Sequence, residues 1–267
     1  MLYFVATPIG NLKDISHRAV EALSNSDVIF CEDTRVSQIL LKHYNINKPL
    51  MSYHKFNEKE TVSKIVKMLK EDKNICVISD SGCPIISDPG QILAQYLREN
   101  DINYSVVPGA NAGLTALMLS GFDSRHFAFL GFLPQKNIEK QKLFENIQNF
   151  DGSLIFYISP HSIEKDLFNI YQGLGNRKAC LVKEITKVFE TTIFFNLGEQ
   201  PDFVKKGEFV LVVEGGQVQI NQTQDFDLDK EYQNLLNQGY TPNKAIAHLA
   251  KKLNKPRNEI YMYFKQK

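Results

Sequence analysis

The chain has 267 residues, of which 43% are hydrophobic and 23% charged, with 31 basic side chains against 30 acidic ones. At roughly 100 to 200 residues per domain, this length predicts about two domains with cores of their own, and the composition excludes disordered and fibrous proteins. The net charge of +1 gives no general reason to bind nucleic acid, so such binding would need a local basic patch.

The first half alternates short apolar runs, rich in β-branched and aromatic residues, with segments of helical spacing. This alternation is typical of an α/β fold. Strands are predicted at residues 2–6, 28–31, 75–79 and 104–107, and helices at 16–23, 36–44, 60–69, 91–99 and 113–119. We expect a first domain, residues 1–119, with a mostly parallel sheet and crossover helices.

The second half brings its strands closer together. Strands are predicted at residues 127–130, 154–158, 179–182, 193–195 and 209–213, with helices at 139–147 and 162–171. The last three strands leave little room for crossover helices, so we expect a second α/β domain, residues 120–216, with an antiparallel or mixed sheet. A polar stretch at 217–229 is predicted to be a linker, and residues 230–267 return to helical spacing.

Cysteine usage and the N-terminus bear on the compartment. The four cysteines lie far apart, which favours buried thiols in a reducing cytosol over a disulfide framework. The first residues have no basic segment and reach Pro8 after a short apolar run, which fits neither a signal peptide nor a membrane span. We expect a soluble cytoplasmic protein without a membrane partner.

Turn-forming residues follow each of the first four strands, at 7–12, 32–35, 80–90 and 108–112. In open α/β sheets ligands bind outside the carboxyl ends of the strands, and Gly, Pro, Asn and Asp let backbone groups approach a ligand closely. These loops also occur in α/β proteins that bind nothing there. They mark the place where a ligand site is expected.

The third loop indicates the kind of ligand. Residues 75–97 contain neither lysine nor arginine, and the chain has no GxxxxGK[ST] or GxGxxG segment. A site for a phosphate-rich nucleotide normally has positive charge or a glycine-rich loop at a helix N-terminus. Because this loop has no basic residue and the chain has neither glycine motif, a ligand without phosphates fits better. S-adenosylmethionine (AdoMet) is such a ligand. GxSxG, HExxH and zinc-spaced Cys or His pairs are absent as well, which disfavours hydrolase and metal sites.

Several ordered motifs resemble the ribosomal RNA small-subunit methyltransferase I family of the tetrapyrrole methylase superfamily (class III AdoMet-dependent methyltransferases). The resemblance spans nearly the whole chain. Its motifs are VATPIGNLKDIS, EDTR, SYHKFNEKE, SDSGCPIISDPG, GFLPQK, KEITK and KGEFVLVVEG. The chain departs from the family pattern at Cys83 in place of threonine, at Ala110-Asn111 in place of Pro-Ser, and at Gln135 in place of arginine.

The resemblance implies two α/β domains with AdoMet in the cleft between them, and a homodimer. It also implies 2′-O-methylation of a cytidine ribose in the decoding region of 16S ribosomal RNA in the small ribosomal subunit. The cofactor contacts it implies are Pro8, Ile9, Ser81, Gly82, Cys83, Ile86, Asn111, Ala112, Tyr157, Lys183 and Phe209.

Candidates for the catalytic residues follow from the chemistry. A ribose hydroxyl is a weak nucleophile, so a positioned general base is expected. Glu32, Asp33 and Arg35 are the first candidates and His54 and Glu58 the second. Each has an ordinary alternative, because Asp33 and Arg35 can pair with each other or cap a helix, and a lone histidine is usually structural.

The tail carries the local basic patch that the whole chain lacks. Beyond residue 240 it has one acidic residue, and tyrosine and phenylalanine lie among its basic side chains. A basic helical piece with aromatics favours docking on a phosphate backbone, and the family's tail resembles a helix-turn-helix. The residues predicted to bind RNA are Lys244, Lys251, Lys252, Lys255 and Arg257. The alternative is a solvated lysine-rich helix.

Two other functions stay open from the sequence. The chain could methylate a tetrapyrrole precursor of sirohaem or cobalamin, although the basic tail and the EDTR segment argue against this. It could also be a ribosome-assembly protein that binds RNA without catalysis. Binding of AdoMet separates both enzymes from the binding protein.

Overall fold

The computed structural model describes residues 1–216, 228–252 and 256–265. The chain forms two compact units, residues 1–218 and 219–267, which are described separately. Residues 217–227 of the predicted linker lie outside the described residues, and residues 228 and 229 begin a helix.

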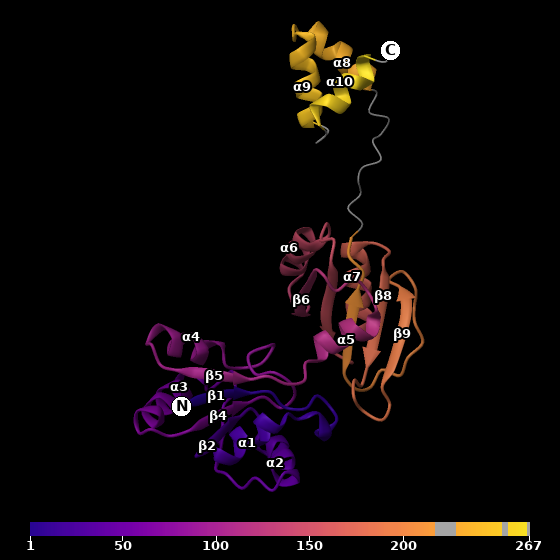
Figure 1. Cartoon of the computed structure of the whole chain (residues 1–267). Coiled ribbons are helices and arrows are strands. Elements are labelled where there is room, and N and C mark those ends of the chain that lie inside the picture. The colour runs from indigo at the N-terminus through magenta and orange to yellow at the C-terminus, as the bar shows by residue number, and fades with distance from the viewer. Residues whose placement is uncertain (217–227, 253–255, 266–267) are drawn as a thin grey trace. The chain divides into compact units, whose positions relative to one another are not determined.

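The first sheet is fully parallel, as predicted (Figure 1). Its order is β3 (Leu50–Ser52), β2 (Val28–Cys31), β4 (Ile75–Ile78), β1 (Leu2–Val5) and β5 (Tyr104–Val107). The helices between the strands are α1 (His17–Asn25), α2 (Thr34–His43), α3 (Glu58–Lys70) and α4 (Gln91–Glu99), and a 3-10 turn covers Leu12–Asp14. Strand β3 is absent from the sequence prediction, because three residues after Pro49 are too short to show alternation.

Both faces of this sheet are buried, and this explains the continuous apolar runs. Successive side chains of a strand point to opposite faces. Leu2 and Phe4 of β1 therefore pack in one core with α3 and α4, while Val5 packs in the other with α1 and α2. A parallel sheet covered by crossover helices on both sides requires this pattern.

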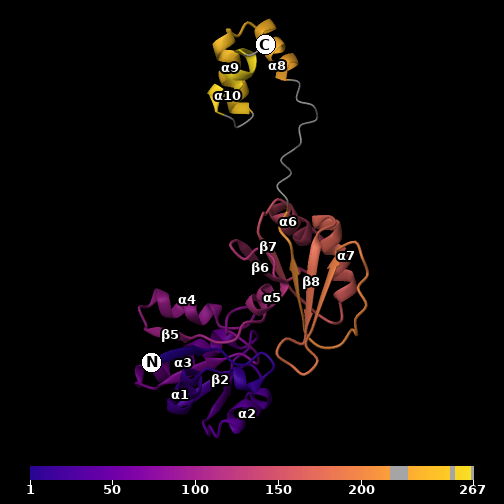
Figure 2. The ribbon, with the colours of Figure 1, turned by 45° about the vertical axis from the view of Figure 1, so that its right-hand side comes forward.

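The second sheet is mixed, also as predicted. Its order is β6 (Phe127–Phe132), β7 (Ser153–Ile158), β10 (Phe209–Val213), β8 (Lys178–Lys183) and β9 (Thr191–Asn196). Strand β6 runs parallel to β7 and the other neighbours are antiparallel. Helices α6 (Asn137–Ile147) and α7 (Ile163–Leu174) cover one face, and α5 (Ala112–Ser120) covers the other (Figure 2).

The tail forms a small unit of three helices, α8 (Leu228–Asn237), α9 (Pro242–Lys252) and α10 (Arg257–Lys265). Leu235, Ile246, Leu249 and Ile260 are buried in its core. The Tyr232 and Phe264 rings stack with their centroids 4.2 Å apart and join the first and last helices. The apolar spacing that predicted a helical tail therefore makes an interior of its own.

No helix among the described residues is both long and apolar enough to cross a membrane.

Candidate active site

The loops singled out in the sequence meet at one edge of the first sheet. Because β1, β2, β4 and β5 are parallel, their carboxyl ends lie on the same side. Thr7 ties two of these loops together, since its backbone N–H donates to Gly82 O at 2.8 Å and its hydroxyl lies 3.3 Å from Ser79 O. The edge is therefore a continuous wall of turns.

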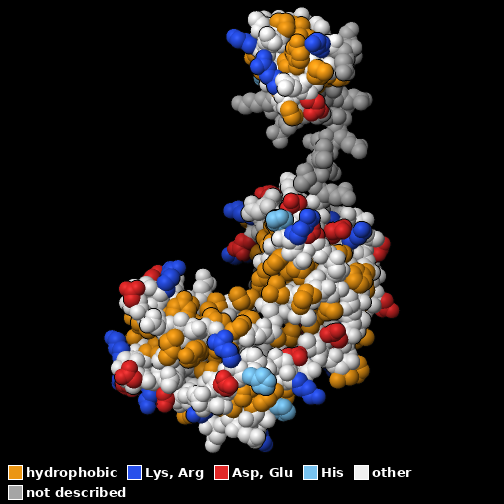
Figure 3. Space-filling model, viewed as in Figure 1, with side chains coloured by type: hydrophobic (Ala, Val, Ile, Leu, Met, Phe, Trp, Pro, Cys, Tyr) orange, Lys and Arg blue, Asp and Glu red, His pale blue; other side chains and the backbone are white. Residues whose placement is uncertain are grey.

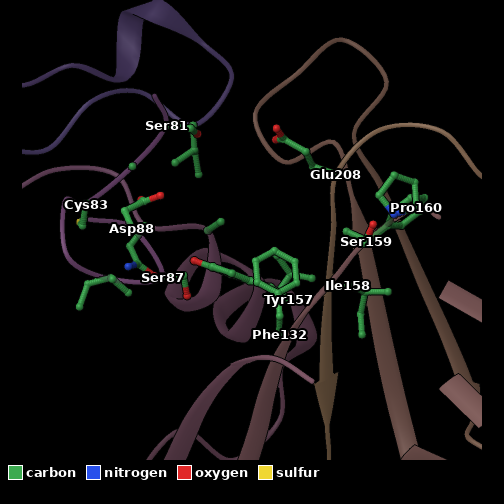
Figure 4. A pocket seen from close by; sticks show the side chains of 17 residues that line it. Ser81, Cys83, Ser87, Asp88, Phe132, Tyr157, Ile158, Ser159, Pro160 and Glu208 are labelled. Carbon is green, nitrogen blue, oxygen red and sulfur yellow. The ribbon is translucent and has the colours of Figure 1, made fainter. Parts of the chain in front are cut away.

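A hollow of about 340 Å³ lies between this wall and the second sheet, and we call it the main hollow (Figure 4). The wall side comes from the loops after β1, β4 and β5, and the other side comes from β6, β7 and β10. Its lining residues are Ile9, Ser81, Gly82, Cys83, Ile86, Ser87, Asp88, Asn111, Ala112, Phe132, Tyr157, Ile158, Ser159, Pro160, Glu208, Phe209 and Val210.

Most of the residues predicted to contact the cofactor line this hollow. They are Ile9, Ser81, Gly82, Cys83, Ile86, Asn111, Ala112, Tyr157 and Phe209. Pro8 instead lines a neighbouring hollow. Lys183, at the end of β8, lines neither of these two hollows. Contact of these side chains with a cofactor stays a prediction.

Sequence reasoning missed part of the lining. The missed residues are Ser87, Asp88, Phe132, Ile158, Ser159, Pro160, Glu208 and Val210. Two signals could have found some of them, because Asp88 belongs to the same Gly- and Pro-rich loop and Glu208 directly precedes the predicted Phe209. Ser87 belongs to that same loop, and the others come from the strands of the second sheet or the residues next to them, whose position against the first sheet is set by tertiary packing.

Two departures from the family pattern contact each other at the wall. The Cys83 thiol lies 3.4 Å from Ala110 O, and burial is the main cause that raises its pKa. Asn111 caps α5, with its Oδ1 accepting from Leu114 N at 2.9 Å. Cys83 therefore acts as a small hydrogen-bonding residue with little thiolate character.

Three carboxylates converge beside the main hollow. Asp88 lines it, and burial, followed by the charges of Glu32 and Asp80, raises the pKa of Asp88 to about 7. The pKa of Glu32 is also raised, by burial first and then by Asp80. Like charges in a partly buried place favour protonation, so Asp88 changes charge near neutral pH.

The chemistry of the lining fits AdoMet. Among the described residues, the charged side chains of the main hollow are Asp88 and Glu208, and no Lys, Arg or His lines it. Ile9, Phe132 and Val210 add apolar walls. Gly82 adopts φ +80°, a left-handed conformation that a side chain disfavours, and a Cβ there would stand 3.3 Å from Ile9 Cγ2. This set suits a cation with apolar parts better than a phosphate ester.

The first catalytic candidates occupy different environments. Asp33 caps α2 through Arg35 N at 2.8 Å and pairs with the Arg35 guanidinium at 2.5 Å, which lowers the pKa of Asp33 to about 2. Its own backbone N–H donates to Asp80 Oδ1 at 2.9 Å. Asp33 therefore holds together the ends of β2 and β4. Because the pKa of Glu32 is raised and that of Asp33 is lowered, Glu32 is the better proton acceptor of the two.

The second candidates lie away from both hollows. Glu58 is buried, and its Oε1 accepts from Tyr53 OH at 2.7 Å and from Gly90 N at 2.9 Å. This makes Glu58 a link between α3 and the start of α4. His54 is half-buried with its ring 6.0 Å from that of Phe56, and its Nδ1 has no hydrogen-bond partner within the described chain. Neither residue lines a hollow that AdoMet would fill.

The predicted RNA-binding residues are placed in part. Lys244 and Arg257 are exposed on the tail unit, and Arg257 reaches Asn243 O at 3.5 Å. Lys251 and Lys252 end α9, and Lys255 lies outside the described residues. The exposed rings of Tyr240 and Tyr261 belong to the same small unit.

Comparison with known proteins identifies the family. Residues 1–201 match the model of the tetrapyrrole (corrin/porphyrin) methylases. The chain is 38% identical to the ribosomal RNA small subunit methyltransferase I of Streptococcus pyogenes serotype M3, over 98% of this chain and 94% of that protein. The chain belongs to the ribosomal RNA small subunit methyltransferase I family. The Pasteurella multocida member is 40% identical over 98% of this chain and 96% of its own length.

Solved structures of other proteins show the same fold. A diphthine synthase superposes with a TM-score of 0.63 at 13% identity, over 80% of this chain and 89% of that one. Uroporphyrin-III-C-methyltransferase from Thermus thermophilus superposes with a TM-score of 0.56 at 16% identity, over 82% and 96%. These likenesses confirm the predicted α/β fold with two sheets, one parallel and one mixed.

Proposed function

We propose that this member of the methyltransferase I family transfers the methyl group of AdoMet to the 2′-hydroxyl of a cytidine in the decoding region of 16S ribosomal RNA. Full-length likeness to small-subunit rRNA methyltransferases carries the proposal. The main hollow supports it, because its acidic and apolar lining suits a sulfonium compound. Since the substrate is ribosomal, we place the protein in the cytoplasm.

The chemistry asks little of the protein beyond alignment. AdoMet supplies an electrophilic methyl group on a charged sulfur. The chain has to hold the acceptor hydroxyl in line, remove its proton and keep water away. Ile9, Phe132 and Phe209 provide apolar surface around the main hollow.

The proposed cofactor residues divide by the chemistry they offer. Ser81, Cys83, Asn111 and Tyr157 bring hydrogen-bonding side chains, while Ile9 and Ile86 bring apolar contact. Pro8 lines the neighbouring hollow, and Lys183 on β8 is the partner of Phe209 on β10 in the sheet register. At the same edge of the first sheet, Glu32, Asp33 and Arg35 would help to orient the ribose that accepts the methyl group.

The tail would hold the RNA. Lys244, Lys251, Lys252, Lys255 and Arg257 give this small unit a basic character that the whole chain lacks. Each lysine or arginine that meets a phosphate releases a counterion, so RNA affinity should fall steeply with salt. Removing residues 229–267 should weaken RNA binding and lower this salt slope while leaving the affinity for AdoMet nearly unchanged. An unchanged salt slope would count against the role of the tail.

We also propose a homodimer. Helix α5 exposes Leu114 (46%), Met118 (74%) and Leu119 (38%), and Phe194 of β9 is 61% exposed. Phe122 contacts Phe194 with ring centroids 6.4 Å apart, which extends the apolar face. Figure 3 shows apolar side chains gathered over this part of the second sheet. An exposed patch of this kind favours association with a second copy.

One experiment tests the proposed function directly. The chain is incubated with methyl-labelled AdoMet and small subunits from cells that lack the modification, and the labelled nucleotide is mapped. Label on one cytidine ribose is expected. Calorimetry with AdoMet alone accompanies the assay. If the chain binds AdoMet but the RNA carries no label, this RNA is not its substrate. If the chain does not bind AdoMet, it is a ribosome-assembly protein that binds RNA without catalysis. Labelling of a uroporphyrinogen-type compound instead would favour the tetrapyrrole reaction.

A further inference from the structure

A second hollow adjoins the main one. It has a volume of about 240 Å³ and lies between the loop after β1, the start of α2, the end of β4 and the loop between β8 and β9. Three residues belong to the walls of both hollows, namely Ile9, Ser81 and Glu208. In methyl transfer the acceptor oxygen must come within about 3 to 3.5 Å of the methyl carbon. A substrate in the second hollow would meet a cofactor in the main hollow at this shared wall.

Glu208 is the carboxylate at that junction. Among the described acidic residues, Asp88 lines the main hollow, Asp80 lines the second and Glu208 lines both. Glu32 and Asp33 line neither. In Figure 4 the Glu208 carboxylate points across the opening toward Ser81, from the second sheet to the first.

The chain holds Glu208 in place through residues of two motifs, KEITK and KGEFVLVVEG. Lys187 Nζ lies 3.1 Å from Glu208 Oε2 and 2.9 Å from Glu184 Oε1. The same Glu184 oxygen accepts from Glu208 N at 2.9 Å. Gly207, at φ +105°, permits this approach, because a Cβ there would stand 2.5 Å from Glu184 Oε1. Glu184 thus fixes both the backbone of Glu208 and the ammonium that pairs with its side chain.

The loop that carries Glu184 and Lys187 is itself anchored to the first sheet. Asn11 N donates to Thr186 Oγ1 at 3.0 Å. Gly10 lies so close to this loop that a Cβ on Gly10 would stand 2.6 Å from Lys187 Cγ and 2.8 Å from Ile185 O. The position of Glu208 is therefore tied to Ile9, its neighbour in the shared wall.

We propose that Glu208 is the catalytic proton acceptor for the ribose hydroxyl, and that Lys187 and Glu184 are its positioning residues. The assignment rests on the proposed function. The ribose oxygen forms a bond to the methyl carbon as the carbon–sulfur bond breaks, and that electron pair goes to sulfur. The hydroxyl proton passes to a Glu208 oxygen. The Glu208 side chain is 69% exposed, so it then returns the proton to water.

The charges around Glu208 are mixed. Lys187 contacts it directly, Lys183 contributes a second positive charge near Glu184, and Glu184 itself is negative. From the first sheet, Asp80 faces it across the second hollow and Asp88 across the main hollow. Because Lys187 is the cation in contact with the Glu208 carboxylate, its removal should leave that carboxylate without its ion-pair partner and less well positioned.

The first test replaces Glu208 with glutamine in the full chain. The variant Glu208→Gln keeps the shape and one acceptor oxygen, so calorimetric affinity for AdoMet and RNA affinity should stay within about threefold. Its kcat should fall on the order of 10²- to 10⁴-fold, the usual contribution of a general base. The matched control is Glu214→Gln, at the other end of β10, where Glu214 makes a 3.8 Å surface pair with Lys178. The control should match the unaltered protein.

The second test distinguishes positioning from mere support. Lys187→Met should lower kcat while leaving KM and the affinity for AdoMet unchanged, and Lys187→Arg should restore most of the lost kcat. A Lys187→Met variant that keeps the kcat of the unaltered protein, or a Lys187→Arg variant that recovers none of the loss, would overturn the positioning role.

The outcomes separate this assignment from the proposed function. If the unaltered chain methylates the RNA and Glu208→Gln keeps kcat within threefold, Glu208 is not the proton acceptor. If the unaltered chain binds AdoMet but never methylates the RNA, the proposed function fails first. A loss of AdoMet affinity as large as the loss of kcat would overturn the assignment as well, because Glu208 would then be a cofactor-binding residue.

Discussion

Tyr53 OH donates a hydrogen bond to Glu58 Oε1 at 2.7 Å, beside the core of the first sheet and away from the main hollow. Gly90 N and Ile92 N donate to the same oxygen at 2.9 and 3.3 Å, so Glu58 also caps α4. Although SYHKFNEKE is one of the motifs that suggested catalysis, these contacts give Glu58 a structural task.

Glu58→Ala should therefore destabilise the fold. The change leaves the hydroxyl and two N–H groups without their acceptor, which costs about 1 to 3 kcal/mol of unfolding free energy for a buried unsatisfied group. Urea denaturation measures the loss, and Glu60→Ala on the exposed side of the same helix is the control. Full stability of Glu58→Ala together with a lost kcat would instead return Glu58 to the catalytic candidates.

Asp33 should contribute stability that depends on acid pH. Its folded pKa of about 2 is below the ordinary 3.8, because Arg35 and the α2 N–H groups favour the charged form. The stabilisation is thus present above pH 3.8 and disappears as the pH falls toward 2. The stability difference between the unaltered protein and Asp33→Asn should narrow over that interval in acid-titrated melting curves. A constant difference would mean that hydrogen-bond geometry matters more than charge.

Asp88 should make AdoMet binding depend on pH near neutrality. Its pKa of about 7 means that the carboxyl gains a negative charge as the pH rises through 7. A negative charge in the main hollow attracts a sulfonium, so affinity should rise between pH 6 and 8, by on the order of tenfold at short range. Calorimetry should show that Asp88→Asn removes this part of the rise. Asp202→Asn, at an exposed site, should leave it unchanged.

Gly10→Ala should damage both stability and methyl transfer. An alanine Cβ would meet Ile185 O at 2.8 Å as well as the Lys187 side chain, and a backbone carbonyl cannot move aside cheaply. The loop between β8 and β9 would shift and take Lys187 with it. Gly121→Ala is the comparison, since nothing lies within 4 Å of a Cβ there and its cost comes only from the left-handed φ of +63°; Gly10→Ala should lose more stability than this variant. Equal melting temperatures for Gly10→Ala and the unaltered protein would contradict the contact.

Met118→Lys should break the proposed dimer. Met118 is 74% exposed at the centre of the apolar face on α5, and a buried lysine without a partner is unfavourable in an interface. Light scattering after size exclusion should show dimers for the unaltered protein and monomers for this variant. Lys142, on α6 of the opposite face, offers the control Lys142→Met. Dimers that persist in Met118→Lys would place the interface elsewhere.

The elements of the fold were largely accessible from the sequence, since the strands of the first sheet are buried on both faces and read as continuous apolar runs. Strand β3 was missed because its pairing with β2 is set by its position in space. In the same way, Phe132, Ser159 and Glu208 reach the main hollow only when the second sheet packs against the loops of the first. Local patterns carry no signal for such a contact.

The roles of the charged motif residues were less accessible still. EDTR predicted chemistry at Asp33, yet the ion pair with Arg35 that determines its pKa is an equally local possibility. KEITK suggested Lys183 as a contact, while the structure directs attention to Lys187, four residues further along the chain in the loop between β8 and β9. The distinction depends on which side chain the loop between β8 and β9 presents to the shared wall.

That loop also limits how stable the protein can become. Glu184 and Thr186 are held at φ 53° and 65°, where a β-branched residue such as Thr186 is strained, typically by about 1 to 3 kcal/mol. Glycine at position 186 would relieve the strain and raise the melting temperature, but it would free Asn11 N and loosen the loop. Selection for thermal stability alone would therefore tend to erode catalysis here, and a thermostable variant of this enzyme should be screened for turnover at this position first.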